Sequence, residues 1–266
     1  MELFSQSRDG DVVTLTITAP TMPPAFFTEI EQVFTELGKD ATLRAVVVRS
    51  SAKAFSYGLD LPKAFAAFGP VMTGGGLAPR RAELHTLIRQ LQRSFTAIAA
   101  CPVPVIAAVH GACIGGGVDL ISACDVRVAS SDAMFSVRET RIAIVADLGS
   151  LARLPGIIGP GHTRDLALTG RDIDAARAER IGLVTQVVAD RDAVWAAAQE
   201  VAAQIAANPP LTVRGVKQVL EYSAGKSVED SLGYVAAWNS AFLASEDLVE
   251  AATAFAQKRA PKFTGR

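Results

Sequence analysis

Hydrophobic residues near the N-terminus first follow the two-residue period of a strand and then the 3.6-residue period of a helix. Residues 12–18 (VVTLTIT) alternate in the β manner, which predicts a strand. Residues 27–37 place their apolar side chains on one helical face. Residues 45–49 (AVVVR) form the β-branched run that is typical of a strand buried on both faces. The protein therefore begins as strand, helix, strand.

The same alternation continues through the middle of the sequence. A loop region that contains Gly74, Gly75 and Gly76 precedes a longer predicted helix. The apolar stripe of this helix consists of Leu84, Leu87, Ile88, Leu91, Phe95 and Ile98. Strands follow at residues 104–109, 126–129 and 134–137, with a turn into a helix at residues 115–123. Strands separated by helices predict parallel pairing through right-handed crossovers, so we expect an α/β layered fold.

The pattern changes near residue 191, after which no strand is predicted. Four helices are expected instead, over residues 193–207, 211–222, 228–244 and 247–259. Large apolar side chains on the last helices, such as Trp238, Phe242 and Phe255, look exposed. Surplus apolar surface of this kind often packs against another subunit. We therefore divide the protein into a core of residues 1–192 and a C-terminal helical region of residues 193–266.

Composition and charge exclude two classes of partner. Half of the residues are hydrophobic and 20% are charged, which is the profile of a compact globular protein. The 26 Lys and Arg residues nearly balance the 27 Asp and Glu residues, so no basic face for nucleic acid is expected. The segment from Ser94 to Val118 has no charged residue and is long enough to span a bilayer, but it contains two prolines and four glycines. We interpret it as a buried strand, turn and helix start, and expect no membrane contact.

Cysteine usage and the N-terminus predict a cytoplasmic protein. Cys101, Cys113 and Cys124 form no CxxC pair, and an odd number of cysteines fits reduced, buried thiols rather than disulfides or a metal site. The first nine residues show no basic region followed by an apolar run, so no secretory signal is expected.

Two glycine-containing loops each follow a predicted buried strand. Residues 53–61 (KAFSYGLDL) form the first, in which Gly58 allows the backbone to turn with its N–H groups outward. Residues 110–119 (HGACIGGGVD) form the second, in which three consecutive glycines open a helix and leave free N–H donors at its positive end. Each loop alone is typical of an ordinary turn. Together they supply paired N–H groups around one carbonyl oxygen, the arrangement that stabilises an enolate.

These loops resemble the signature of the crotonase (enoyl-CoA hydratase/isomerase) superfamily. The resemblance is carried by AFSYGLDL (residues 54–61) and PVIAAVHGACIGGGVDLISACDVRVAS (residues 104–130), and it runs from about residue 44 to 190. The tail AQKRAPKFTGR is similar too. The resemblance implies a crotonase-type spiral of repeated ββα units, followed by a C-terminal helical region that forms trimers. It also implies an oxyanion hole made by the backbone N–H groups of Leu59 and Gly116.

Three acidic residues are similar in type and spacing to those of Δ3,5-Δ2,4-dienoyl-CoA isomerases. They are Asp119, Glu139 and Asp147, and the surrounding GGGVDLISACDVR and VADLGSLARLPGIIG also resemble that subgroup. Isomerisation of a 3,5-dienoyl-CoA to a 2,4-dienoyl-CoA removes a proton from C2 and returns one at C6, and two acids divide such work well. By resemblance, Asp147 takes the C2 proton, Glu139 delivers a proton to C6, and Asp119 lies between them. Clustered carboxylates raise one another's pKa, so part of the set is expected to be protonated near neutrality.

The expected ligand is an acyl-CoA thioester, with no metal and no cofactor apart from the coenzyme A of the substrate. The expected substrate- and CoA-binding residues are Lys53, Phe55, Ser56, Tyr57, Gly58, Leu59, Asp60, Gly115, Gly116, Lys262 and Phe263. The last two lie in a tail that, in the family, approaches the coenzyme of a neighbouring subunit. Loops such as residues 65–79 are expected to form the walls of the acyl pocket.

Two alternatives remain open at this point. Asp119 and Glu139 also fall where enoyl-CoA hydratases carry their two catalytic glutamates, so addition of water to a 2-enoyl-CoA is a second candidate reaction. A catalytically silent acyl-CoA-binding subunit is the third. By resemblance, the protein is expected to be a homotrimer or a hexamer built as a dimer of trimers.

Overall fold

The computed structural model describes residues 3–72 and 78–266, and its main sheet has the order β1-β2-β3-β4-β6-β9. These strands are β1 (Phe4–Asp9), β2 (Val12–Ile17), β3 (Ala45–Ser50), β4 (Val105–Val109), β6 (Val126–Ser130) and β9 (Gln186–Val188). The pair β1–β2 is antiparallel, and every later pair in this sheet is parallel. The predicted α/β fold with parallel crossovers is confirmed. The predicted loop glycines Gly74, Gly75 and Gly76 lie outside the described residues.

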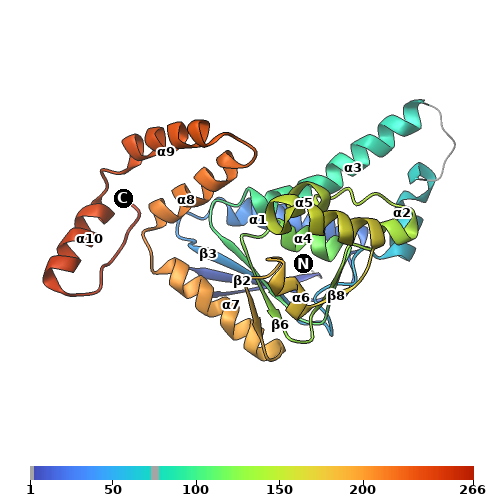
Figure 1. Ribbon diagram of the computed structural model, residues 1–266, viewed down its shortest axis with the longest axis horizontal. Coiled ribbons are helices and arrows are strands. Elements are labelled where there is room, and N and C mark those ends of the chain that lie inside the picture. The colour runs from blue at the N-terminus through green and yellow to red at the C-terminus, as the bar shows by residue number, and fades with distance from the viewer. Residues whose placement is uncertain (1–2, 73–77) are drawn as a thin grey trace.

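Helices cover both faces of this sheet (Figure 1). One face packs against α7 (Arg191–Ala206), and the other lies beneath α1 (Pro24–Leu37), α3 (Ala78–Ala99), α4 (Gly116–Ser122) and α5 (Ser150–Thr169). In β3, Val46 and Val48 join the larger hydrophobic cluster while Val47 joins the cluster beneath α7. Successive strand residues point to opposite faces, so this alternation accounts for the predicted run that is buried on both sides.

A small second sheet stands at the carboxyl end of the main one. It contains β5 (Ala112–Ile114), β7 (Met134–Ser136) and β8 (Ile173–Asp174) in the order β5-β7-β8. The backbone passes from β4 into β5 within three residues, through Gly111, whose φ is +56°. This sharp turn needs glycine, and it carries the backbone out of the main sheet towards the glycine-rich start of α4.

Three further helical segments lie near the same end of the molecule. They are α2 (Leu61–Met72), the 3₁₀ helix η1 (Glu139–Ile142) and α6 (Ala175–Arg180). The expectation that residues 65–79 are loop is wrong for residues 65–72, because these continue α2. Gly69 and Pro70 resemble a helix breaker, and α2 ends two residues after Pro70, at Met72.

The C-terminal region consists of helices, as the sequence predicts. After α7 come α8 (Pro210–Ser223), α9 (Val228–Phe242) and α10 (Glu246–Gln257), with α9 and α10 lying apart from the sheet in Figure 1. Large apolar side chains remain exposed here, including Phe255 at 88% and Val249 at 67%.

The three cysteines are buried, as expected, and the reduced state of their thiols stays a prediction. Within residues 3–72 and 78–266, no helix combines the length and the apolar character needed to cross a membrane.

Candidate active site

The two glycine-containing loops are joined by backbone hydrogen bonds. The Ser56 N–H donates to the Ala112 C=O at 2.9 Å, and the Ile114 N–H donates to the Ser56 C=O at 2.9 Å. Gly58, with φ of +79°, lies so close to the second loop that a β-carbon there would stand 2.8 Å from the Ile114 carbonyl oxygen. Any larger residue would push the loops apart, so glycine is required at position 58.

This contact brings the N–H groups of Leu59 and Gly116 close together. A β-carbon built on Gly116 would lie 4.0 Å from the Leu59 nitrogen, and one built on Gly58 would lie 3.3 Å from the Gly116 nitrogen. Among the described residues, neither amide donates a hydrogen bond to a protein acceptor. Gly116 is the first residue of α4, where N–H groups have no intrahelical acceptor. Two adjacent unused donors therefore result from the fold.

Both residues line a cavity of about 720 Å³. Its floor contains Gly58, Leu59, Gly115 and Gly116, with Tyr57 at the edge. Apolar side chains of α1, α2, α3, η1 and the segment after η1 form the walls: Phe27, Leu61, Phe68, Met72, Leu84, Leu87, Ile88, Leu91, Ile142, Ile144, Val145 and Leu148. The volume and the mainly apolar lining are those of a small-molecule site.

The three predicted acids line this same cavity. Asp119 on α4 is only 2% exposed, and its Oδ1 accepts the Ser150 N–H at 2.6 Å. Glu139 begins η1; its Oε2 is buried without a hydrogen-bond partner, and its Oε1 lies 3.2 Å from the position that a β-carbon on Gly115 would occupy. Asp147 follows in the irregular segment before α5. Within the described part of the protein, none of the three forms a salt bridge.

Burial raises the pKa of all three acids, although the charge of Arg153 partly lowers that of Asp119. It raises the pKa of Asp119 to about 6, against the opposing hydrogen bond from Ser150. It raises the pKa of Glu139 to about 7, and the charge of Asp119 adds to that effect. Burial also raises the pKa of Asp147. The expected direction is therefore right, but desolvation contributes more than the mutual repulsion from which it was predicted.

Other predicted binding residues lie around the first loop. Lys53 is exposed, and its Nζ lies 5.6 Å from the centroid of the Tyr57 ring, which places it beside the cavity rather than in it. Asp60 is turned towards the start of α2, where its Oδ1 accepts the Lys63 N–H at 3.2 Å. Asp60 thus caps a helix that forms the cavity wall.

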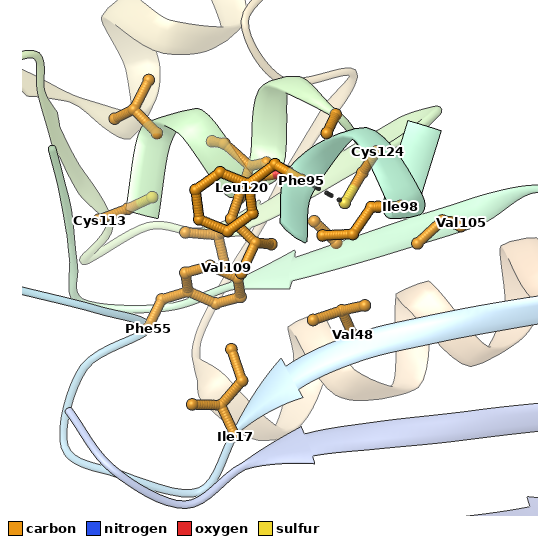
Figure 2. Close-up of a cluster of buried hydrophobic side chains, with 14 of the residues drawn as sticks. Ile17, Val48, Phe55, Phe95, Ile98, Val105, Val109, Cys113, Leu120 and Cys124 are labelled. Carbon is orange, nitrogen blue, oxygen red and sulfur yellow. Dashed lines mark hydrogen bonds between the residues drawn. The ribbon is translucent and has the colours of Figure 1, made fainter. Parts of the chain in front are cut away.

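Phe55 and Ser56 do not line the cavity, and their expected contact with substrate is corrected accordingly. The Phe55 ring is fully buried and points into the core beside Ile17 and Val109, as Figure 2 shows. Ser56 is 1% exposed, and its Oγ accepts the Gly58 N–H at 3.0 Å. Residues 54–56 are buried in succession where the segment pairs with the second loop, so they anchor the donor loop to the core instead of facing a ligand.

Lys262 and Phe263 lie in the tail after α10, away from the cavity of their own subunit. The Lys262 N–H donates to Glu250 Oε1 at 2.7 Å, and the Phe263 C=O accepts from Arg44 at 2.6 Å. Their predicted contact concerns a neighbouring subunit, and it stays a prediction.

Helix α3 contributes to the site in a way that the sequence patterns did not predict. The half-buried Leu87, Ile88 and Leu91 of its apolar stripe line the cavity together with Phe68 of α2, which lies in the region expected to form the pocket walls. The apolar stripe of α3 runs at helical spacing from Leu84 to Ile98, so no local signal separates the residues that line the cavity from those of the core.

Comparisons with known proteins agree with this geometry. The family model for enoyl-CoA hydratase/isomerase matches residues 8–266. A mitochondrial Delta(3,5)-Delta(2,4)-dienoyl-CoA isomerase from Dictyostelium discoideum is 43% identical over 91% of this protein and 83% of its own length. A peroxisomal Delta(3,5)-Delta(2,4)-dienoyl-CoA isomerase from Arabidopsis thaliana is 40% identical over 99% of this protein and 96% of its own length. The crystal structure of an enoyl-CoA hydratase from Bacillus anthracis has a TM-score of 0.89 at 27% identity, covering 99% of this protein and all of that one. The expected crotonase-type architecture is confirmed.

These relatives correct the expected location. One is named as mitochondrial and the other as peroxisomal, which contradicts the cytoplasmic location inferred from the sequence. That inference rested on a missing secretory signal and on unpaired cysteines. Neither feature separates the cytosol from an organelle that is entered by a different signal.

Proposed function

The protein belongs to the enoyl-CoA hydratase/isomerase family, and from this premise we propose that it isomerises 3,5-dienoyl-CoA to 2,4-dienoyl-CoA. The observation that carries the proposal is the joint placement of Asp119, Glu139 and Asp147 around one cavity with two unused backbone donors. Relatives that are 40–43% identical are named as isomerases of this kind, which favours isomerisation over hydration.

The N–H groups of Leu59 and Gly116 are proposed to donate to the thioester oxygen. Negative charge develops on that oxygen when the C2 proton leaves, because the electron pair of the C2–H bond spreads over the diene and the carbonyl. Donors that are already in place stabilise this charge without reorganisation, and one such donor contributes about 3–4 kcal/mol.

The carboxyl groups are proposed to move the protons. Asp147 takes the C2 proton, the double bonds shift from C3 and C5 to C2 and C4, and Glu139 delivers a proton to C6. A pKa of about 7 keeps part of Glu139 protonated near neutrality, as a proton donor requires. Asp119 is proposed to lie between the two, and its charge raises the pKa of Glu139. The reaction moves protons and double bonds without net oxidation, so we propose no metal or redox cofactor.

The apolar walls are proposed to hold the acyl group, and the rim to hold the coenzyme. Tyr57 and Lys53 stand beside each other at that rim. The Lys262 ammonium and the Phe263 ring of a neighbouring subunit are proposed to complete the coenzyme site.

The C-terminal region, residues 193–266, is proposed to mediate trimerisation. Its exposed apolar side chains support this role, since a stable monomer rarely leaves so many uncovered. A homotrimer or a dimer of trimers is expected, and light scattering of the purified protein measures which forms.

Two substrates distinguish the candidate functions. Incubation with a 3,5-dienoyl-CoA should produce the stronger ultraviolet absorbance of a diene conjugated to the thioester, whereas crotonyl-CoA should lose little absorbance. Rapid loss of the crotonyl-CoA signal with no isomerisation would favour a hydratase. Binding of coenzyme A esters without turnover of either substrate would favour a silent subunit.

A further inference from the structure

Helix α3 is tied to the segment that carries Asp147 by one side chain. Gln92 Nε2 donates to the backbone carbonyl oxygen of Asp147 at 2.7 Å, across 55 positions of sequence. One turn earlier, Arg89 donates to Gln92 Oε1 at 2.7 Å. A guanidinium has only donors, so the amide oxygen must face Arg89 and the amide NH₂ must face the carbonyl. The Gln92 side chain therefore has a defined orientation.

The segment that Gln92 holds makes few other hydrogen bonds. Residues 144–148 form no helix or strand, and they lie between η1 and α5. The Ile144 N–H donates to the Glu139 C=O at 3.0 Å, and Arg153 reaches the Leu148 C=O only at 3.5 Å. Among the described residues, Gln92 provides the hydrogen bond that joins Asp147 to another element.

We propose that Gln92 is a positioning residue for Asp147, an inference that rests on the proposed function. The Asp147 carboxyl group is separated from its own backbone by a single methylene, so the position of its C=O fixes where the carboxylate reaches. A base must lie within about 2.6–3.2 Å of the proton it removes. A misplacement of about 1 Å lowers the rate of such a step about 10²-fold.

The same helix also contacts the bound acyl group in the proposed complex. Leu87, Ile88 and Leu91 line the cavity, and Leu91 directly precedes Gln92. An acyl group that packs against these residues therefore contacts the helix that positions the base. This arrangement links recognition of the acyl group to the placement of the base.

The test compares three variants. Gln92→Leu removes the hydrogen bond, Gln92→Glu keeps the size of the side chain but removes the donor when ionised, and Gln90→Leu is the control on an exposed position of α3. Both Gln92 variants should lower kcat about 10- to 100-fold with KM changed less than about twofold. A substrate deuterated at C2 should show a larger isotope effect in both, because removal of the C2 proton becomes slower. Gln90→Leu should match the parent protein in all three quantities.

Two outcomes separate this inference from the proposed function. If the parent protein isomerises 3,5-dienoyl-CoA while Gln92→Glu folds and keeps both its kcat and its isotope effect, the positioning role is overturned and the function stands. If the parent protein does not isomerise this substrate, the function fails, and the inference is then judged by carbon-13 NMR of the aspartate carboxyl groups. The Asp147 titration should change in Gln92→Leu but not in Gln90→Leu, and an unchanged titration would overturn the inference.

Discussion

Asp119 in the middle of α4 and Asp125 just after this helix lie six positions apart, and their surroundings are opposite. Asp119 faces the cavity, is 2% exposed and accepts a single N–H from Ser150. Asp125 Oδ2 accepts the Lys217 ammonium at 2.7 Å and the Val105 N–H at 2.7 Å. The lysine comes from α8 and is itself 7% exposed.

The difference shows how one fold uses buried charge in two ways. At Asp125 a cation offsets desolvation, and the pair fastens the C-terminal helices to the core. At the cavity no salt bridge offsets it, and the pKa of Asp119 rises to about 6. A buried acid without a counter-charge destabilises the fold, and it is also the kind of group that exchanges protons near neutral pH. Substitutions on the two sides of this contrast should therefore have different consequences.

The largest effect is expected from Asp147→Asn, which removes the proposed base from the cavity. The value of kcat for 3,5-dienoyl-CoA should fall about 10³-fold, because the amide cannot accept the C2 proton. Ultraviolet assays measure the rate, and circular dichroism should show an unchanged fold. Retention of more than a tenth of the activity would exclude Asp147 as the base.

Lys217→Met removes the salt bridge between Lys217 and Asp125. It leaves Asp125 without its cation, and the free energy of unfolding should fall by about 3 kcal/mol in a urea titration. The double variant with Asp125→Asn should recover part of this loss. Activity per folded molecule should be unchanged, since the pair does not line the cavity. If Lys217→Met had the same free energy of unfolding as the parent protein, the salt bridge would not fasten α8 to the core.

Glu139→Gln should instead stabilise the protein while it removes the proposed acid. The folded-state pKa of Glu139, about 7, lies above its ordinary value of 4.5. The folded state therefore holds the proton more tightly than the unfolded state. The resulting contribution to the free energy of unfolding is complete below about pH 4.5 and is lost as pH rises through 7. At pH 8 the variant should be more stable by about 2 kcal/mol, and at pH 4 the gain should vanish. If the variant and the parent protein were equally stable at both pH values, Glu139 would not be an ionisable group buried without a counter-charge.

The smallest effect concerns pH dependence. The plot of kcat/KM against pH should be bell-shaped, falling at low pH as Asp147 takes up a proton and at high pH as Glu139 loses its own. Asp119→Asn removes a charge that raises the pKa of Glu139, so the alkaline limb should move to lower pH. A shift of the alkaline limb to higher pH in this variant would contradict the proposed role of Asp119.

Patterns along the sequence were sufficient to predict most of the scaffold. An alternating run located β2, continuous apolar runs located β3 and β4, and apolar stripes located α1 and α3. The four C-terminal helices were predicted as well. The three acids and the two donor loops followed from a family resemblance, and the cavity brings them together.

What escaped prediction depends on contacts between distant residues. No local pattern indicates that Gln92 reaches Asp147, since 55 residues separate them. Phe55 lies between residues that surround the site, but its ring turns into the core, where Ile17 and Val109 lie beside it. The raised pKa values likewise arise from desolvation, which only the folded cavity produces.

A crystal structure with a bound, unreactive acyl-CoA thioester tests the proposed mechanism most directly. We predict that the Leu59 and Gly116 nitrogens each lie about 2.7–3.1 Å from the thioester oxygen. We also predict that the Asp147 carboxyl group faces C2 and the Glu139 carboxyl group faces C6. The mechanism would be contradicted if the thioester oxygen were bound elsewhere, or if neither carboxyl group faced the acyl group.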